Sequence, residues 1–179
     1  QSARLDTMNC CLFDVAAVLS GGFEMGNVWY NEPKTLDTAF DVMGDIILST
    51  AAQQYGGFTV PEVDKILAPY AKKSYDRYVE EFMKYSDPSW VGREEKAVER
   101  ALDKVRREYD QGWQGIEYKL NTVGSSRGDY PFVTVTLGLG TGQFEKMCSM
   151  SLLAVHKGGQ GKAGRSEERR VGKECRSRW

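Results

Sequence analysis

Two adjacent cysteines near the start of the chain, Cys10 and Cys11, are the side chains best suited to radical or redox chemistry. A thiol can give a hydrogen atom to a carbon radical, or it can pair with a second thiol when electrons are transferred. Neighbouring cysteines do not easily form an unstrained disulfide with each other, so a redox partner would have to come from elsewhere. Cysteine is also a small apolar residue that is often simply buried. The pair therefore predicts either a reactive thiol or an inert core residue, and residue type alone favours the inert one.

The remaining cysteines, Cys148 and Cys175, lie far from this pair in sequence, and no two cysteines have the Cys-x-x-Cys spacing of a zinc site. The single histidine, His156, has no second ligand nearby in sequence and is expected at a helix end. We therefore predict no metal site in this chain. Few cysteines and no N-terminal secretion signal are typical of a protein of the reducing cytoplasm.

Two features of the sequence could bind an anion. Gly138, Gly140 and Gly142 lie between a predicted strand and a predicted helix, so their loop could hold a phosphate at the helix N-terminus. The loop lacks the lysine and the spacing of a P-loop, and a tight strand-to-helix turn explains it equally well. Lys34, just before another predicted helix, could bind an anion together with the helix dipole, although a solvated surface lysine is the commoner case.

The first long helical pattern that must position these residues runs from Leu36 to Gln54. Apolar residues recur there at three- and four-residue steps, and Gly56-Gly57 is expected to end the helix. The apolar stripe is wide, which suits a core helix or a helix at a subunit interface.

Further elements follow in order along the chain. Thr59-Val60-Pro61-Glu62 has the Thr-x-x-Glu spacing of a capping box and predicts a helix start, whereas Pro69 is expected to kink or divide the helix that follows. An amphipathic pattern from Arg93 to Leu120 predicts the longest helix, with its charged face in solvent. A strand at Phe132–Leu137 and a helix at Gln143–His156 complete the order of an α/β unit.

Length and charge restrict the class of protein. The 179 residues are enough for one domain or for a piece of a larger one, and no apolar run is long enough to span a bilayer. Six basic and three acidic residues lie in the last fifteen positions, so the rest of the chain holds 18 basic and 22 acidic residues. A mildly acidic body argues against nucleic-acid binding, which needs a basic surface.

Short blocks in one order along the chain resemble the anaerobic ribonucleoside-triphosphate reductases, the glycyl-radical class of ribonucleotide reductase. The resemblance covers roughly residues 8–164, and it rests on the number of blocks in the same order rather than on any single one. The blocks are Asn9-Cys10-Cys11-Leu12-Phe13-Asp14, Gly22-Phe23-Glu24-Met25-Gly26-Asn27, Glu32-Pro33-Lys34-Thr35, Gln54-Tyr55-Gly56-Gly57, Leu67-Ala68-Pro69-Tyr70, Glu117-Tyr118-Lys119-Leu120-Asn121-Thr122, Pro131-Phe132 and Gly138-Leu139-Gly140-Thr141.

The resemblance implies an α/β fold, a partial ten-stranded α/β barrel that is mostly helical in this piece. It implies reduction of ribonucleoside triphosphates to deoxyribonucleotides by thiyl and glycyl radical chemistry. Cys10 resembles the cysteine that delivers hydrogen on the 2′ side of the ribose, with Cys11 as the alternative. The glycyl radical and a structural zinc would lie in a C-terminal part that this chain lacks.

The same resemblance implies allosteric control and protein partners. Lys34 and Asp45 resemble the region that binds an effector nucleotide, ATP or a deoxyribonucleoside triphosphate, near the interface of a homodimer. A radical-SAM activating enzyme is the other implied partner, whereas neither nucleic acid nor a membrane is expected. The active protein would be cytoplasmic.

Two segments are expected within this chain. Residues 1–164 resemble the N-terminal part of the reductase barrel domain with its effector and dimer helices. Residues 165–179 resemble a translated DNA-sequencing adapter and are expected to be a non-native, disordered tail. The resemblance also implies that the thiyl cysteine, the zinc motif and the glycyl-radical loop lie beyond this chain, so the fragment alone is expected to be inactive. The alternative function is a non-catalytic helical interaction module that dimerises through the Leu36–Gln54 face, and a glycyl-radical lyase relative is a weaker enzymatic alternative.

Overall fold

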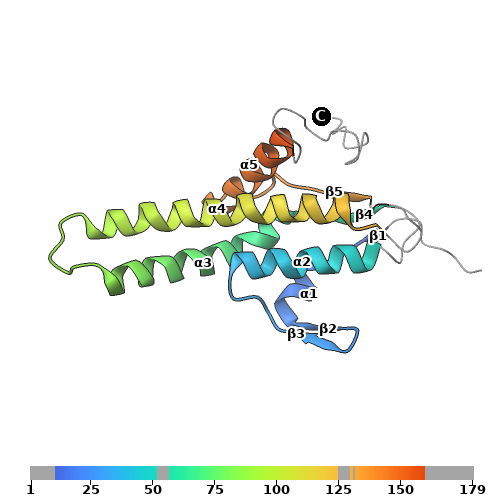
Figure 1. Ribbon diagram of the computed structural model, residues 1–179, viewed down its shortest axis with the longest axis horizontal. Helices are drawn as coiled ribbons and strands as arrows, with labels where there is room; N and C mark the ends of the chain where they lie inside the picture. Colours follow the sequence, from blue (N-terminus) through green and yellow to red (C-terminus); the bar gives the residue numbers. More distant parts are fainter. Residues whose placement is uncertain (1–10, 52–56, 125–129, 131, 160–179) are drawn as a thin grey trace, which may run out of the picture.

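A three-stranded parallel sheet brings together three segments that are far apart in the chain, and helices pack against it. The computed structural model describes residues 11–51, 57–124, 130 and 132–159 (Figure 1). Along these residues the elements are β1 (Cys11–Leu12), α1 (Val15–Gly21), β2 (Phe23–Met25), β3 (Val28–Tyr30), α2 (Leu36–Ala51), β4 (Phe58–Val60), α3 (Val63–Tyr85), α4 (Arg93–Thr122), β5 (Val133–Val135) and α5 (Gln143–Gly158).

The sheet has the strand order β1-β4-β5, and both pairs of neighbours are parallel. Phe58 and Val60 of β4 are completely buried, whereas Leu12 of β1 is 73% exposed and Thr134 of β5 is also exposed. One face of the sheet is therefore covered by helices and the opposite face is open. Parallel strands joined through helices confirm the predicted α/β class and its helix-rich character. β2 and β3 form a separate antiparallel hairpin.

Helix α2 supplies much of the core. Its buried residues lie on more than one side of the helix, which contacts α1, α3, α4 and β4. The wide apolar stripe is therefore explained by packing within this chain, as predicted for a core helix. The alternative of an interaction module loses its basis, because the face that it would use is already buried. The residues buried in α2 are Leu36, Ala39, Phe40, Val42, Met43, Gly44, Ile46 and Ile47.

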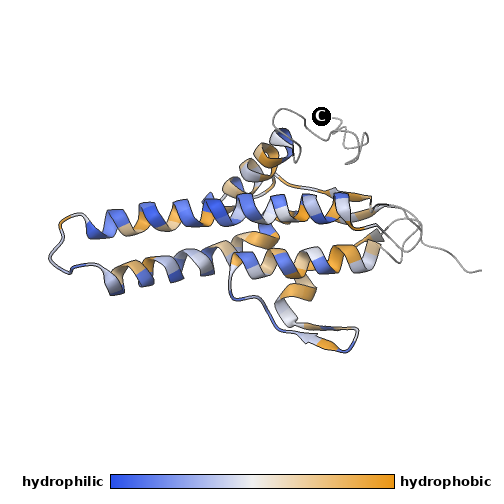
Figure 2. Cartoon of the chain, in the orientation of Figure 1, coloured by the Kyte–Doolittle hydropathy of each residue, from blue (hydrophilic) through white to orange (hydrophobic). Residues whose placement is uncertain are grey.

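Helices α3 and α4 lie side by side and extend away from the sheet as a long hairpin (Figure 1). The outer half of this hairpin consists mostly of hydrophilic residues, whereas α2 and the elements next to the sheet are richer in apolar residues (Figure 2). Pro69 lies inside α3, and the helix continues through it to Tyr85. Pro69 therefore does not divide the helix, and a kink stays a prediction. In α4 the charged face is largely exposed as predicted, but Val98 is also exposed, and Ala97 and Ala101 are buried in its place.

The predicted capping box at the start of α3 is wrong. Thr59 belongs to β4, and Glu62, the residue before the helix, has a left-handed backbone (φ 48°) and makes no side-chain cap. The amides at this helix start are instead satisfied by Thr136, which follows β5. The Glu62 amide donates to the Thr136 hydroxyl oxygen (2.7 Å), and the Val63 amide donates to the Thr136 carbonyl oxygen (2.9 Å). Hydrogen bonds to Thr136, which is distant in sequence, therefore replace the local cap at the start of α3.

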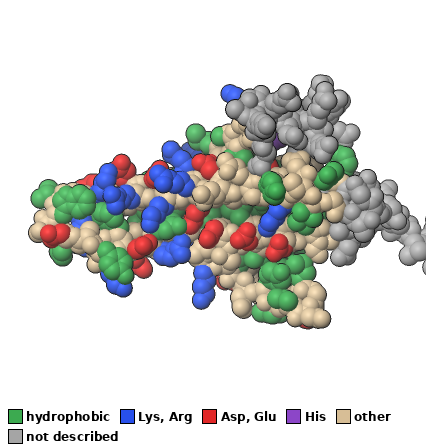
Figure 3. Space-filling model, in the orientation of Figure 1, with side chains coloured by type: hydrophobic (Ala, Val, Ile, Leu, Met, Phe, Trp, Pro, Cys, Tyr) green, Lys and Arg blue, Asp and Glu red, His purple; other side chains and the backbone are tan. Residues whose placement is uncertain are grey.

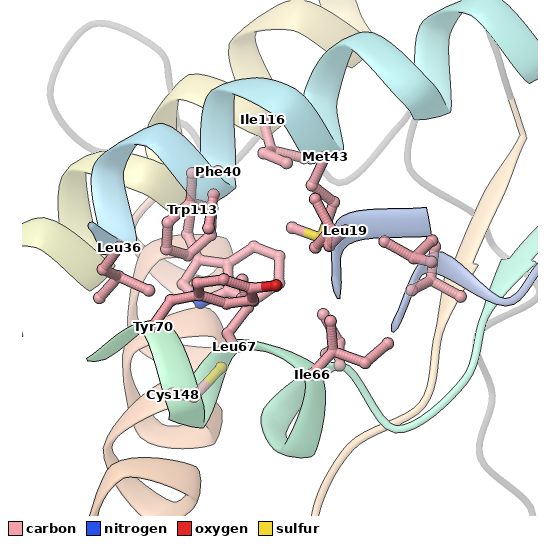
Figure 4. Close-up of a cluster of buried hydrophobic side chains, with 14 of the residues drawn as sticks. Leu19, Leu36, Phe40, Met43, Ile66, Leu67, Tyr70, Trp113, Ile116 and Cys148 are labelled. Atoms are coloured by element: carbon pink, nitrogen blue, oxygen red, sulfur yellow. The ribbon is translucent and has the colours of Figure 1, made fainter. Parts of the chain in front are cut away.

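The centre of the core is an aromatic contact between α2 and α4, part of which Figure 4 shows. The Phe40 ring meets Trp113 edge-on, with ring centroids 5.0 Å apart, and meets Tyr109 at 6.1 Å. Gly112 lies directly against Phe40, because a Cβ built on this glycine would overlap the Phe40 ring. The two helices can approach so closely only because residue 112 has no side chain.

Candidate functional site

The cysteine pair is placed only in part by the structure. Cys10 lies outside the described residues. Cys11 begins β1, where it is level with Phe58 of β4. Asp14, three residues further on, caps α1 by accepting a hydrogen bond from the Ala17 amide (3.0 Å). The turn from strand to helix directly after the cysteine pair is therefore fixed by a local cap.

Lys34 is exposed and lies two residues before the first residue of α2. Among the described residues, no carboxylate is within ion-pair distance of its ammonium group. The first amide of α2, at Leu36, donates to the Ser74 hydroxyl of α3 (2.9 Å), and Thr35 accepts a longer bond from Thr38 (3.5 Å). The helix start is thus partly capped, while the lysine itself is free to meet an anion from solvent.

Asp45 pairs with Lys119 of α4 rather than with Lys34. The Lys119 ammonium lies 3.6 Å from Asp45 and 3.7 Å from Asp41, and its side chain covers Gly44. Nine helical residues separate Asp45 from the start of α2, which is about 14 Å along the axis. The two predicted effector contacts are therefore not adjacent. Figure 3 shows acidic side chains along α2 and many basic ones over α3 and α4.

The glycine loop after β5 has its amides already engaged. The Gly138 and Gly140 amides both donate to the same oxygen of Asp64, Oδ2, at 3.0 Å. At the start of α5, a Cβ on Gly142 would overlap the Glu145 carboxylate. Asp64 therefore takes up two of the loop amides that a phosphate could have used, and the Glu145 carboxylate lies beside the helix start. Both contacts favour the tight strand-to-helix turn over the phosphate interpretation.

Asp64 is the residue that sequence reasoning missed. It lies in the first turn of α3, where an acidic residue is usually a solvated partner of the helix dipole, yet here it is completely buried. Its position between the apolar residues Val63 and Ile66 was the only signal in the sequence. Its second oxygen, Oδ1, has no hydrogen-bond partner among the described residues, and the same holds for the buried Tyr109 hydroxyl.

Cys148 is not a reactive thiol. It is completely buried on α5, and this burial raises the pKa of the thiol well above its ordinary value, with the nearby Asp64 charge raising it further. The thiolate, which is the nucleophilic form, is therefore negligible near neutral pH. Burial likewise raises the pKa of the Tyr109 hydroxyl beyond its usual range. Both groups act as core residues.

His156 lies in the last turn of α5, as predicted, but it has a partner that the sequence did not reveal. Its Nδ1 is 3.1 Å from the carboxylate of Glu117, which is buried on α4. The adjacent contact, between the Ser151 hydroxyl and Asp110, also joins these helices. Polar pairs therefore fix α5 against α4.

A cavity of about 420 Å³ opens at the outer end of the α3–α4 hairpin. Aromatic and charged side chains line it, and Lys34 is not among them. The two basic groups, Arg100 and Lys104, are matched by two carboxylates, Glu81 and Asp87, and Lys104 is already 3.6 Å from Glu81. The cavity has no net positive charge that would select a nucleotide.

Two further features concern the described ranges, from residue 11 to 159 with their gaps. No helix there combines the length and the apolar character needed to cross a membrane. No group of three or more His, Cys, Asp or Glu side chains in these ranges is placed to hold a metal ion.

Comparison with known proteins gives one family. The family model described as "Anaerobic ribonucleoside-triphosphate reductase" matches residues 1–171. The protein of that name from Enterobacteria phage T4 is 36% identical over 163 residues, which are 91% of this chain and 26% of the phage protein. Those from Haemophilus influenzae and Escherichia coli are 34% and 33% identical over 154 residues, 86% of this chain and 21% of each relative. The chain thus spans between a fifth and about a quarter of the relatives' length.

Proposed function

We propose a function from the family of this chain, which belongs to the anaerobic ribonucleoside-triphosphate reductases. The chain is part of a catalytic subunit that reduces ribonucleoside triphosphates to deoxyribonucleotides. The observation that carries the proposal is the family match along residues 1–171, supported by relatives at 33–36% identity. Because the chain covers about a quarter of those relatives or less, the activity belongs to a longer protein. The segment on its own is expected to be inactive.

The sheet supports a barrel as the complete fold. Three parallel strands have helices on one face, while the other face, with Leu12 and Thr134, is open. An α/β barrel has this arrangement, with helices outside and the open face turned to the interior. Further strands would pair with the free edges of β1 and β5. The ten-stranded barrel is therefore proposed for the longer protein.

Within this chain the thiol of Cys10 is proposed to hold the hydrogen that is delivered on the 2′ side of the ribose, with Cys11 as the alternative. A glycyl radical and a structural zinc, proposed for the C-terminal part, would supply the radical and hold that part together. The described residues offer no metal ligand set, so the zinc is not assigned to them.

Regulation and partners are proposed on the same basis. An effector nucleotide would place its phosphates near Lys34, which is exposed and unpaired among the described residues, whereas Asp45 would have to leave Lys119 before it could contact the effector. A homodimer, a radical-SAM activating enzyme and a cytoplasmic location complete the proposal.

The direct test is turnover by the longer protein. After anaerobic activation, we expect it to convert a ribonucleoside triphosphate into the corresponding deoxyribonucleotide, measured by chromatography of the nucleotides. The 179-residue chain under the same conditions serves as the control and should form no product. Absence of deoxyribonucleotide from the activated longer protein, with radical formation verified by electron paramagnetic resonance, would rule the proposal out.

Replacing Lys34 by alanine should weaken effector binding. Loss of one ammonium group from a phosphate site should raise the effector concentration for half-maximal response by about tenfold, with a larger change at low salt. The matched control is Lys65→Ala, because Lys65 is also an exposed lysine but pairs with Glu62 at 3.0 Å. Equal shifts in the two variants, measured by effector titration of turnover, would remove Lys34 from the effector site.

A further inference from the structure

One face of the three-stranded sheet carries a row of three residues that lie level with one another. Leu12 of β1 is paired with Thr59 of β4, and Thr59 is paired with Thr134 of β5. Neighbouring parallel strands are about 4.8 Å apart, so the two threonines are direct neighbours across the sheet. We name Leu12, Thr59 and Thr134 the open-face row.

The burial of the flanking residues shows that the open-face row is turned away from the helices. Phe58 and Val60, on either side of Thr59, are completely buried in the helical core. Phe13, which follows Leu12, packs against the Phe58 ring with the ring centroids 5.5 Å apart. Because successive side chains of a strand point to opposite faces, Leu12 and Thr59 lie on the face that the helices leave uncovered.

Thr134 has the same orientation on β5. Its neighbours Val133 and Val135 are partly buried against the helical core, whereas Thr134 is exposed. Within the described ranges, the hydroxyls of Thr59 and Thr134 make no hydrogen bond to another residue. Thr136 differs from both, because its hydroxyl already accepts a hydrogen bond from the Glu62 amide (2.7 Å). The sheet therefore presents two adjacent hydroxyl groups on its uncovered face.

The barrel proposed for the longer protein gives these hydroxyls a specific environment. The uncovered face would be the barrel interior, where branched apolar residues usually predominate. A hydroxyl enclosed there needs a hydrogen-bond partner, because burying it without one is unfavourable. The open-face row thus calls for a polar partner on the inner side of the sheet.

The position of the row next to β1 indicates which partner this is. Cys11 is the first residue of β1, and β4 and β5 are the next two strands of the sheet. Across the sheet, Thr59 and Thr134 are therefore about 5 Å and 10 Å from β1. A nucleotide that reacts at the cysteine strand is long enough to reach both hydroxyls. Its sugar and phosphate oxygens can accept hydrogen bonds from threonine.

We propose that Thr59 and Thr134 bind the ribonucleotide substrate by donating hydrogen bonds from their hydroxyls to its sugar or phosphate oxygens. This inference rests on the proposed reductase function and on the barrel proposed for the longer protein. It adds two substrate contacts on the strands beside the cysteine strand.

The test uses the activated longer protein with Thr59→Val or Thr134→Val, each of which removes a hydroxyl and keeps a β-branched side chain. Each substitution should raise KM for a ribonucleoside triphosphate by about three- to tenfold, since one hydrogen bond to the substrate is lost. Thr59→Ser and Thr134→Ser keep the hydroxyl and should hold KM within about twofold of the parent protein. Thr122→Val is the matched control, because the Thr122 hydroxyl bonds within α4, to the Tyr118 carbonyl oxygen (2.7 Å), and its KM should stay unchanged.

Equilibrium binding to the protein before activation, with cytidine and cytidine triphosphate as probes, distinguishes the two kinds of oxygen. Weaker binding of both probes in the valine variants would place the contacts on the sugar, and weaker binding of the triphosphate alone would place them on the phosphates. A change in only one variant would remove the other threonine from the site.

Unchanged KM and unchanged binding in both valine variants would overturn the inference, because the open-face row would then pack only against other side chains of the barrel. If the activated parent protein forms no deoxyribonucleotide, the reductase proposal fails as well. Turnover by the parent with unchanged KM in the variants overturns this inference alone.

Discussion

Cys10→Ala in the longer, activated protein is expected to lower deoxyribonucleotide formation by about 10³-fold or more, because the substitution removes the hydrogen that must be delivered to the substrate. The side chain loses only its sulfhydryl group and no charge at neutral pH. Substrate and effector binding should therefore stay within about twofold of the parent protein. Turnover and equilibrium binding of nucleotide are the two measurements.

Two cysteine variants serve as controls for this result. Cys11→Ala changes the neighbouring residue of the chain, which the proposal does not place against the substrate, so this variant should retain most of the activity. Cys148→Ala removes a buried, protonated thiol and should also retain turnover. Loss of turnover in Cys11→Ala with activity kept in Cys10→Ala would transfer the role to Cys11. Full activity in both variants would exclude the pair from the reaction.

Gly112→Ala should be the most destabilising of the small substitutions in the helical core. The added Cβ would overlap the Phe40 ring, which is 3% exposed and held between Tyr109 and Trp113. Overpacking of this kind costs about 1–3 kcal/mol or more, and the better helix propensity of alanine returns about 1 kcal/mol. We expect the free energy of unfolding to fall by about 1–2 kcal/mol, measured from urea midpoints with intrinsic tryptophan fluorescence.

Gly115→Ala is the control, because it is the same change one turn further along α4. A Cβ on Gly115 meets no atom within 4 Å, so this variant should be more stable by about 0.5–1 kcal/mol. Combining Gly112→Ala with Phe40→Leu should recover part of the lost stability if the overlap is the cause. Equal midpoints for the two glycine variants would show that the close contact between α2 and α4 does not limit stability.

The sequence alone determined most helices and the family, because those signals are local or cumulative. Apolar residues at three- and four-residue steps placed α2, α4 and α5 within a few residues of their observed limits, and β-branched residues placed β5. Helical periodicity depends only on neighbours in the chain. The wide stripe of α2 predicted a covered helix for the same reason, but the stripe could not say which elements cover it.

Only the tertiary structure decided how the strand ends are held. The Thr-x-x-Glu spacing before α3 fits a local cap, yet the amide of Glu62 bonds to Thr136, 74 residues away. Asp64 likewise reads as a solvated first-turn acid, until β5 brings the Gly138 and Gly140 amides to its carboxylate. Gly112 shows no special pattern in the sequence, and its role depends on Phe40 from another helix. Each of these contacts joins residues that are distant in sequence. It can therefore stabilise the protein only after the strands and helices have packed together.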